Sequence, residues 1–346
     1  MRSSRIRRGL SMIAAVGLGV ALTTTAQAAT PDDMHYPAAS VAYETFDIGS
    51  RGVQYTHVNG INNNGVIVGD YGDRQGQHGF VKDGESVSVI NVPGAKRTIL
   101  TSVNDAGTVV GVYVTAGSSI QHGFMQSASG EFTALDEPLA ASTERRDYWG
   151  TVPEGINNAG VVVGYYFTTS PRGATCGDKP CDKTVSHGFS WNGDFTTYDP
   201  PDVSTEDNPR TGTRLFDINN DNVVVGSYLY LDSEQVGVTP GFRVLLSGEG
   251  FTTYIDPGFP ANWCWSTTPS SINDSGTIAG LTVNGCGMSD LAWLLPAGDT
   301  TFATATEVDP PSSIYTEVCD INNTGVVVGS WTDSDGRAHG FIATPL

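Results

Sequence analysis

Three observations predict an all-β fold for this chain of 346 residues. A short phrase, consisting of an aliphatic residue, Asn, two variable residues and Gly, recurs six times, with Asn222 in place of Gly in the fourth copy, and leads each time into a Val-rich run. The runs between turn signals are β-branched or aromatic, and no long stretch has the 3.6-residue period of a helix. The two ends of the chain resemble complementary parts of one repeat. Together these observations predict six four-stranded units closed into a ring, a six-bladed β-propeller.

The repeated phrase sets the period of the units. Its six copies begin at Ile61, Val103, Ile156, Ile218, Ile272 and Ile321. Successive copies lie between 42 and 62 residues apart, a spacing typical of propeller blades or repeat arrays. Asn can bond its own turn and Gly supplies a positive φ at no steric cost, so each copy predicts a tight turn between two strands.

Each unit carries four strand signals in a fixed order. The first leads into the turn, as at 215–218, and the second is the Val-rich run, as at 161–165. A third run begins with His-Gly-Phe, and a fourth, as at 195–198, ends at Asp-Pro. Short runs punctuated by Gly, Asn, Asp and Pro predict antiparallel strands joined by turns, which is the construction of a propeller blade.

The ends of the chain predict how the ring closes. The sixth unit stops after its third strand, at 339–342, and the run at 43–48 resembles the missing fourth strand. An N-terminal strand in the last blade would close the ring and remove an open sheet edge. An open solenoid is the alternative, but it leaves the match between the two ends without a reason.

The N-terminus predicts export from a bacterium. Basic residues at 2–8, an apolar stretch at 12–22 and the small-residue site Ala26-Gln27-Ala28 indicate a signal peptide over 1–28. The pair Arg7-Arg8 leaves a twin-arginine route open beside the general secretory one. We therefore expect a linker at 29–42 and a single propeller domain at 43–346, in a secreted or periplasmic protein. No other stretch approaches the roughly 18 apolar residues of a spanning helix, so membrane insertion is not expected.

The net charge of the chain limits the classes of partner that we expect. The chain has 18 Lys and Arg against 37 Asp and Glu, a formal net charge of −19. So acidic a surface repels nucleic acid and anionic lipid. We expect a monomer kept soluble by its charge; attraction of a cationic or calcium-rich partner is the alternative.

Five cysteines in an exported chain predict disulfides with one thiol left over. Cys176 and Cys181 bracket a short loop, and Cys264 and Cys286 flank one copy of the phrase. These are the two predicted pairs, which leaves Cys319 unpaired.

The repeat resembles a bacterial extracellular repeat family named after its His-Ala-Phe motif. The resemblance rests on Ile-Asn-x-x-Gly-x-Val-Val-Gly-x-Tyr, then His-Gly-Phe, then Phe-Thr-x-x-Asp-x-Pro, and it covers about 43–346. Gly replaces Ala in the surviving triplets, and the fourth and fifth units carry 240–242 (Pro-Gly-Phe) and 291–293 (Leu-Ala-Trp) instead. The resemblance implies an exported repeat protein and no particular activity or catalytic set.

The His-Gly-Phe histidines predict packing and not a metal centre. They are His78, His122, His187 and His339. Equivalent positions on separate blades point to separate places, whereas metal ligands must converge on one ion. Asp333-Ser334-Asp335-Gly336 resembles a calcium loop but lacks the regular spacing and the distal Glu. We expect no metal and no cofactor, with calcium at this loop as the alternative.

The variable loops predict the functional face. All the length variation falls in connections that reach one face of a propeller, at 137–155, 168–186, 200–217 and 257–271, and such loops commonly carry recognition and catalysis. The candidate ligand-binding residues on or beside them are Arg146, Tyr148, Trp149, Arg210, Arg214, Trp263, Trp265 and Tyr315. Aromatic rings stack on sugar faces, and Arg bonds hydroxyls or uronates.

The start of each innermost strand predicts the residues around the mouth of the channel. Four residues before each copy of the phrase stand His57, Ile99, Val152, Arg214, Thr268 and Glu317. His57, Arg214 and Glu317 are therefore expected to approach one another, and the candidate catalytic residues are Glu317, His57, Glu154 and Asp207.

These features predict a secreted binding module that presents a polar, aromatic-lined site for a small molecule or glycan. The alternative is a carbohydrate-active enzyme with its site at the mouth of the channel. A glycoside hydrolase would use two of the carboxylates Glu154, Asp207 and Glu317, whereas a polysaccharide lyase would use His57 or a Tyr as base, with Arg214 against a uronate. A purely structural role in the cell envelope is a third possibility. The sequence carries no motif for nucleophilic catalysis.

Overall fold

The structure is a computed structural model of the whole chain. It describes residues 36–49, 52–140, 150–169, 175–176, 179–180, 184–199, 212–231, 237–238, 241–247, 252–254, 265–284 and 291–346. Every regular element among these residues is a β-strand, as the sequence predicts. Within the same ranges, no helix has the length and apolar character needed to cross a membrane.

The first three units are built alike from antiparallel strands. The first consists of β2 (Tyr55–Ile61), β3 (Ile67–Gly72), β4 (Gln77–Asp83) and β5 (Ser86–Ile90). The second consists of β6 (Ala95–Val103), β7 (Val109–Thr115), β8 (His122–Gln126) and β9 (Phe132–Ala134), and a single parallel pair, Gln77 with Arg97, joins it to the first. The third consists of β10 (Thr151–Ile156), β11 (Val162–Thr169), β14 (Thr184–Trp191) and β15 (Phe195–Tyr198). The short pair β12 (Thr175–Cys176) and β13 (Lys179–Pro180) lies between β11 and β14 in the chain.

The remaining units follow the same order. The fourth consists of β16 (Gly212–Ile218), β17 (Val223–Leu231), β19 (Gly241–Leu245) and β20 (Thr252–Tyr254), with β18 (Gly237–Val238) added beside β17. The fifth consists of β21 (Trp265–Ile272), β22 (Ile278–Asn284), β23 (Leu291–Leu295) and β24 (Thr306–Glu307). The sixth consists of β25 (Tyr315–Ile321), β26 (Val327–Thr332), β27 (Ala338–Pro345) and β1 (Val41–Phe46).

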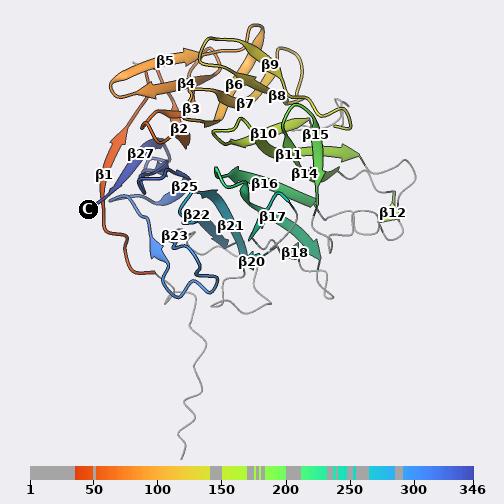
Figure 1. Cartoon of the computed structure of the whole chain (residues 1–346). Helices are drawn as coiled ribbons and strands as arrows, with labels where there is room; N and C mark the ends of the chain where they lie inside the picture. The colour runs from red at the N-terminus through yellow and green to blue at the C-terminus, as the bar shows by residue number, and fades with distance from the viewer. Residues whose placement is uncertain are drawn as a thin grey trace, which may run out of the picture.

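The first strands of the units surround a common centre (Figure 1). Each contacts the first strand of the next unit, in the order β2, β6, β10, β16, β21 and β25, and β25 contacts β2 in turn. Six apolar clusters among the described residues lie at the junctions. In one of them, for example, Val163 of the third unit packs with Leu215 and Phe242 of the fourth. The apolar core is therefore distributed over the junctions between neighbouring units.

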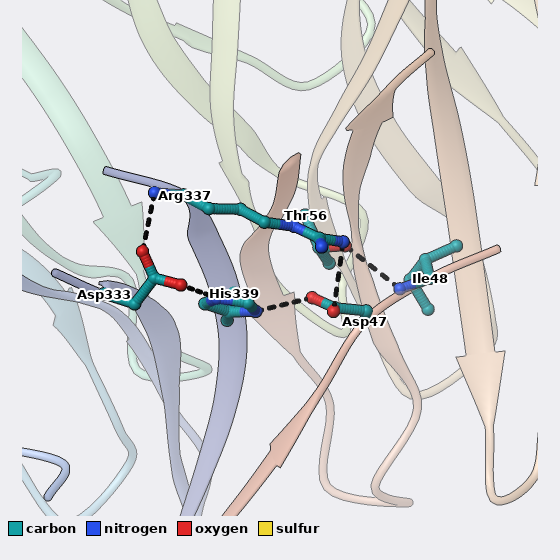
Figure 2. A network of polar contacts seen from close by, with 6 residues as sticks. All are labelled: Asp47, Ile48, Thr56, Asp333, Arg337 and His339. Atoms are coloured by element: carbon teal, nitrogen blue, oxygen red, sulfur yellow. Dashed lines mark hydrogen bonds and ion pairs between the residues drawn. The ribbon is translucent and has the colours of Figure 1, made fainter. Parts of the chain in front are cut away.

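The N-terminal strand completes the last unit, as the ends of the sequence predict. β1 runs from 41 to 46, slightly earlier than the expected 43–48, and pairs antiparallel with β27 from Val41 opposite Pro345 to Phe46 opposite Gly340. A polar network follows directly after this pairing (Figure 2). Asp47 accepts from Arg337 Nη2 at 3.2 Å and lies 2.8 Å from His339 Nδ1. The first described strand and the last are thus joined by backbone and side-chain contacts together.

The Asn of the repeated phrase forms a closed ring of hydrogen bonds. Each Nδ2 donates to the backbone carbonyl of the same Asn in the next unit, at 2.9–3.3 Å, through Asn62, Asn104, Asn157, Asn219, Asn273, Asn322 and back to Asn62. Each Oδ1 accepts backbone N–H groups of its own turn, as Asn62 does from Asn64 and Val66. One side-chain type therefore closes the turn and joins it to its neighbour, which explains why Asn recurs in all six copies.

A second ring surrounds the first on the exposed side of the turns. Here each backbone N–H donates to the side-chain oxygen of the next member, at 2.8–2.9 Å, through Asn63, Asp105, Asn158, Asn220, Asp274 and Asn323. The two acidic members each accept amide hydrogens from both neighbours. These contacts lower the pKa of Asp105 and Asp274 against the effect of burial.

Glycine recurs in the Val-rich strand because the first strand lies too close for a side chain. Every first strand has a register shift two residues before the end of its pairing, as between Val58 and Gly60 of β2. A Cβ on Gly69 of β3 would lie 2.0 Å from the carbonyl oxygen of His57 and 2.9 Å from the ring of Phe80. The Gly and the Phe of the motif are thus steric consequences of the same bulged junction.

Candidate functional site

A cavity of about 400 Å³ lies at the centre of the ring, beyond the Asn rings. The bulge in each first strand brings two kinds of side chain to it, those at the bulge and those two residues earlier. Residues at the bulge are Asn59, Thr101, Glu154, Phe216, Ser270 and Cys319, and all six line the cavity. The bulge is therefore the local feature that builds the site.

The residues expected at the mouth of the channel largely reach this cavity. His57, Ile99, Val152, Thr268 and Glu317 line it, whereas Arg214 does not. Each of these positions is paired with a residue of the second strand, and three of the partners also line the cavity: Asp70 opposite His57, Val112 opposite Ile99, and Tyr165 opposite Val152. Asp320, beyond the bulge of β25, lines it as well. Of the four candidate catalytic residues, three (His57, Glu154 and Glu317) share one cavity.

Glu154 is held in its neutral form. Burial raises the pKa of its carboxyl to about 8, and the negative charge of Glu317 adds to the rise. The positive charge of Arg214 and a hydrogen bond from the Tyr165 hydroxyl act in the opposite direction. Burial and the neighbouring Glu154 raise the pKa of Tyr165 above its usual range. At neutral pH, Glu154 therefore faces the cavity as an uncharged acid.

Glu317 and His57 line another part of the same cavity and interact through their charges. Burial raises the pKa of Glu317, and the charge of His57 opposes this rise. The Glu317 side chain still has access to water within the cavity, since the residue is exposed. His57 stacks on Tyr55, with ring centroids 4.6 Å apart, and its Nδ1 lies 3.8 Å from Asp70 Oδ2.

Asp70 connects this environment to a polar chain. Its carboxylate accepts from Gln77 Nε2 at 2.6 Å and from Asn59 Nδ2 at 3.3 Å. Gln77 in turn accepts from Arg97 Nε at 2.7 Å. Burial raises the pKa of Asp70, whereas these donors and the charge of His57 act to lower it.

The guanidinium of Arg214 lies over two aromatic rings beside the cavity. Its guanidinium carbon is 4.8 Å from the ring centroid of Tyr165 and 5.8 Å from that of Phe167. The side chain is exposed and influences Glu154 electrostatically. Among the described residues that line the cavity, none is Lys or Arg, whereas five are Asp or Glu. Arg214 thus lies beside the cavity and close enough to act on Glu154, and its expected approach to His57 and Glu317 remains a prediction.

The other candidate ligand-binding residues fall largely outside the described ranges. These are Arg146, Tyr148, Trp149, Arg210 and Trp263, and the candidate catalytic residue Asp207 also lies outside them. Trp265 starts β21, where its backbone pairs with Asn284, and Tyr315 starts β25 with its side chain 36% exposed. Most of the variable loops also lie outside the described ranges, so the predicted loop face remains a prediction.

The two predicted disulfides also remain predictions. Cys181, Cys264 and Cys286 lie outside the described residues, and Cys176 is described only through the backbone pairing of β12 with β13. Cys319 has a free thiol and lines the cavity. Burial and the nearby carboxylates raise its pKa.

The His-Gly-Phe histidines have a packing role, as predicted. Nδ1 of each lies 2.8–3.0 Å from an acidic or amide oxygen at the end of the fourth strand, in the pairs His78–Asn91, His122–Asp136, His187–Asp199 and His339–Asp47. Each ring also packs against an aromatic residue of the second strand, as Trp331 does on His339 at 4.8 Å. The four histidines therefore act separately, each within its own unit.

In the calcium-like loop 333–336, the first carboxylate, that of Asp333, bonds groups of the protein itself. Asp333 Oδ1 accepts from the backbone of Asp335 at 2.9 Å. It also accepts from the backbone of Arg337 at 2.9 Å, and Oδ2 lies 3.1 Å from His339 Nε2 (Figure 2). In the described part of the chain, no group of three or more His, Cys, Asp or Glu is placed to hold a metal ion.

Several residues of the site and its support were not predicted from the sequence. Asp70 and Tyr165 directly follow the Gly of the Val-rich run, so aligning the units one residue further along the second strand would have found them. A buried Thr also stands five residues before every copy of the phrase: Thr56, Thr98, Thr151, Thr213, Thr267 and Thr316. In the first three units its hydroxyl accepts a backbone N–H from the incoming connection, as Thr56 does from Ile48 at 3.0 Å (Figure 2).

Comparison with known proteins supports the fold and leaves the activity open. No family model matches the chain, and no curated protein matches it. A crystal structure of a protein of unknown function from Dyadobacter fermentans has a TM-score of 0.50 and 13% identity, with 90% of this chain and 97% of that chain covered. Virginiamycin B lyase from Staphylococcus aureus gives 0.44 and 11%, over 87% and 99%. The six-bladed β-propeller lectin of Aleuria aurantia gives 0.45 and 9%, over 84% and 93%. The described strands make the chain all-β, and a six-bladed β-propeller is among the solved structures to which it is similar.

Proposed function

We propose that the six units form a closed six-bladed β-propeller whose central cavity binds a polar ligand, and that this ligand is a glycan. The single observation that carries the proposal is the convergence of His57, Glu154 and Glu317, from three different units, on one cavity of about 400 Å³. That volume lies within the range of small-molecule sites. The proposal includes export by the N-terminal signal and membership of the His-Ala-Phe repeat family.

The chemistry of the wall indicates the kind of glycan. Neutral Glu154 can donate a hydrogen bond, and Asn59, Gln77 and Thr101 offer further donors and acceptors for hydroxyl groups. Tyr165 and Phe216 supply aromatic surface of the kind on which sugar rings stack. Because five carboxyl groups and no Lys or Arg line the described wall, a neutral or amino sugar suits it better than a uronate.

Binding to defined polysaccharides tests this proposal. Laminarin, mannan, chitosan oligosaccharides and polygalacturonate would be titrated against the exported chain by calorimetry. We expect a neutral or amino glycan to bind, polygalacturonate not to bind, and His57→Ala or Glu317→Gln to weaken the affinity at least tenfold.

The matched control is Asn323→Ala, on the exposed ring of the turns. It should leave the affinity unchanged, because Asn323 lies at the opposite end of the central axis from the cavity mouth. Binding that neither cavity variant weakens, or no binding across the panel, would contradict the proposal.

Glycoside hydrolysis is the second candidate, favoured by one specific observation. Glu154 is protonated at neutral pH and Glu317 lies close enough to raise its pKa, so two carboxyl groups with different environments share the cavity. Such a pair can divide the roles of general acid and of base or nucleophile.

The test is the release of reducing ends from the same polysaccharides. A hydrolase would lose activity at least a hundredfold in Glu154→Gln, and its activity would fall above about pH 8 as Glu154 loses its proton. Binding without turnover in the wild-type protein would exclude this candidate and leave the binding module.

A further inference from the structure

Asp217, Ser271 and Asp320 form a buried polar cluster that the proposed function does not use. They occupy the same position, directly before the repeated phrase, in the fourth, fifth and sixth units. Asp217 and Asp320 line both the central cavity and the smaller hollow, of about 60 Å³, that the Asn rings enclose. The cluster thus separates the cavity from the turns. In the other three units the same position is Gly60, Ser102 or Gly155.

The Ser271 hydroxyl lies between the two carboxyl groups. Its Oγ is 2.7 Å from Asp217 Oδ2 and 2.5 Å from Asp320 Oδ1. Each of the four carboxyl oxygens also accepts a backbone N–H at 2.7–2.9 Å, from Ile218, Ile272, Ile61 and Ile321. Every oxygen of the pair is therefore already occupied by a donor from the protein.

Counting hydrogens fixes the protonation of the cluster. A serine hydroxyl has one hydrogen, so it can donate to only one of the two carboxyl groups. If both were ionised, the other contact would place two oxygen atoms 2.5–2.7 Å apart with no hydrogen between them. One proton on the second carboxyl, donated to Ser271 Oγ, completes the chain at distances typical of charge-assisted bonds. A second proton would have no acceptor within the cluster, because Ser271 Oγ already accepts the first.

We infer that Asp217, Ser271 and Asp320 are a proton-binding site, in which the folded protein holds one proton on the Asp pair through the serine hydroxyl. The proton belongs to the pair and not to one residue. It joins the fourth, fifth and sixth units, and the N–H of Ile61 extends the connection to the first. Loss of this proton leaves two buried like charges at the junctions, so the site couples pH to the integrity of the ring.

The surrounding charges favour retention of the proton. The titratable groups on the strands packed around the cluster are Arg214 on β16, Glu317 and Cys319 on β25, Glu154 on β10 and His57 on β2, with Asp274 in the turn after β21. Burial raises the pKa of Asp217, with Asp274 adding to the rise, and burial together with Asp217 raises the pKa of Asp320 to about 7.

The sign of the pH effect follows from these directions. The unfolded chain releases this proton near the ordinary aspartate pKa of 3.8, whereas the folded chain retains it up to about pH 7. The stability that the proton contributes is therefore fully present below about pH 4 and is lost as the pH rises through 7.

The test is the pH dependence of the unfolding equilibrium in wild-type protein and Asp320→Asn, by denaturant titration between pH 4.5 and 6.5. Asn is neutral and can donate to Ser271, so it imitates the protonated carboxyl. We expect the slope of log K for unfolding against pH to be lower by about one proton in Asp320→Asn. Ser102→Ala, at the equivalent position between Gly60 and Gly155, should keep the wild-type slope.

An unchanged slope in Asp320→Asn would overturn the inference. If that variant fails to fold, Asp217→Asn makes the same measurement from the other carboxyl. Infrared spectra of wild-type protein with isotope-labelled aspartate need no substitution at all. They should contain the carbonyl band of a protonated aspartate at pH 6 that disappears by pH 9, and the absence of this band at pH 6 would equally overturn the inference.

Discussion

The two ends of the central axis differ in how strictly the six units repeat the same residue. At the turn end, all six units place Asn in the inner ring, and each bonds the next in the same way. At the cavity end, the six bulge positions carry five different kinds of chemistry: amide, hydroxyl, carboxyl, phenyl and thiol. Repetition therefore identifies the scaffold, and departure from the repeat identifies the residues available for chemistry.

The largest effect is expected at the turn end, from Asn157→Ala. Asn157 donates to Asn219 O at 3.3 Å and to Asn222 Oδ1 at 3.0 Å, and accepts from Ala159 and Val161 of its own turn. Removing these buried contacts should lower the free energy of unfolding by about 3 kcal/mol.

The free energy of unfolding from denaturant titration is the measurement, with Asn158→Ala in the exposed ring as the control. The control should cost less than about 1 kcal/mol, because water can replace its contacts. Equal losses in the two variants would contradict a special role for the inner ring.

At the cavity end, Glu154→Gln is expected to change how the free energy of unfolding depends on pH. At low pH it should change that free energy little. The pKa of Glu154 is about 8 in the folded protein, above its ordinary value of 4.5. Stability contributed by the protonated form is present below about pH 4.5 and lost as the pH rises to 8. Gln keeps the neutral shape, so at pH 9 the variant should be more stable than wild type by on the order of 2 kcal/mol.

Thermal unfolding at pH 5 and pH 9 measures this difference. A variant that is less stable than wild type at both pH values would show that Glu154 is an ionised, well-paired group instead.

A smaller effect is expected where the ends of the chain meet. Asp47→Ala removes the partner of His339 Nδ1 and of Arg337, next to the strand that completes the last unit. Because Asp47 is partly exposed, the loss should be about 1 kcal/mol. Asp136→Ala removes the equivalent His122 contact inside a unit and is the matched control. Hydrogen exchange should report faster opening of β1 in the first variant alone, and equal exchange would contradict a closing role.

The smallest effect on stability is expected from His57→Ala. The His57 side chain is 44% exposed, and it stacks on Tyr55 at the edge of the cavity. Its removal should change the free energy of unfolding by less than about 0.5 kcal/mol while weakening binding of the glycan found in the panel. A large loss of stability would show that His57 has a structural role and would contradict its assignment to the site.

The sequence predicted those features that the repeat itself encodes. The tight turns, the strand order and the N-terminal strand in the last unit follow from local propensity and from matching ends, and the pairing of β1 with β27 confirms the last of these. The placement of His57 and Glu317 in one cavity also followed, because equivalent positions in a ring of units face the same axis, whereas Glu154 was a candidate from the variable connection 137–155.

Other features depended on geometry that no single repeat displays. Arg214 stands at the same position as His57 and Glu317, yet its guanidinium lies over the rings of Tyr165 and Phe167, a contact that the repeat does not encode. Likewise, the shared proton of Asp217 and Asp320 requires three side chains from three units, and each of them alone resembles an ordinary turn residue.

Reactivity of the Cys319 thiol tests most directly whether the divergent end of the axis is the binding end. Cys319 is unpaired and lines the cavity, so a thiol reagent reports access to the cavity in the unaltered protein. With the glycan that binds in the panel present at saturation, the rate of modification should fall at least fivefold. An unchanged rate at saturation would place the ligand elsewhere and contradict the account.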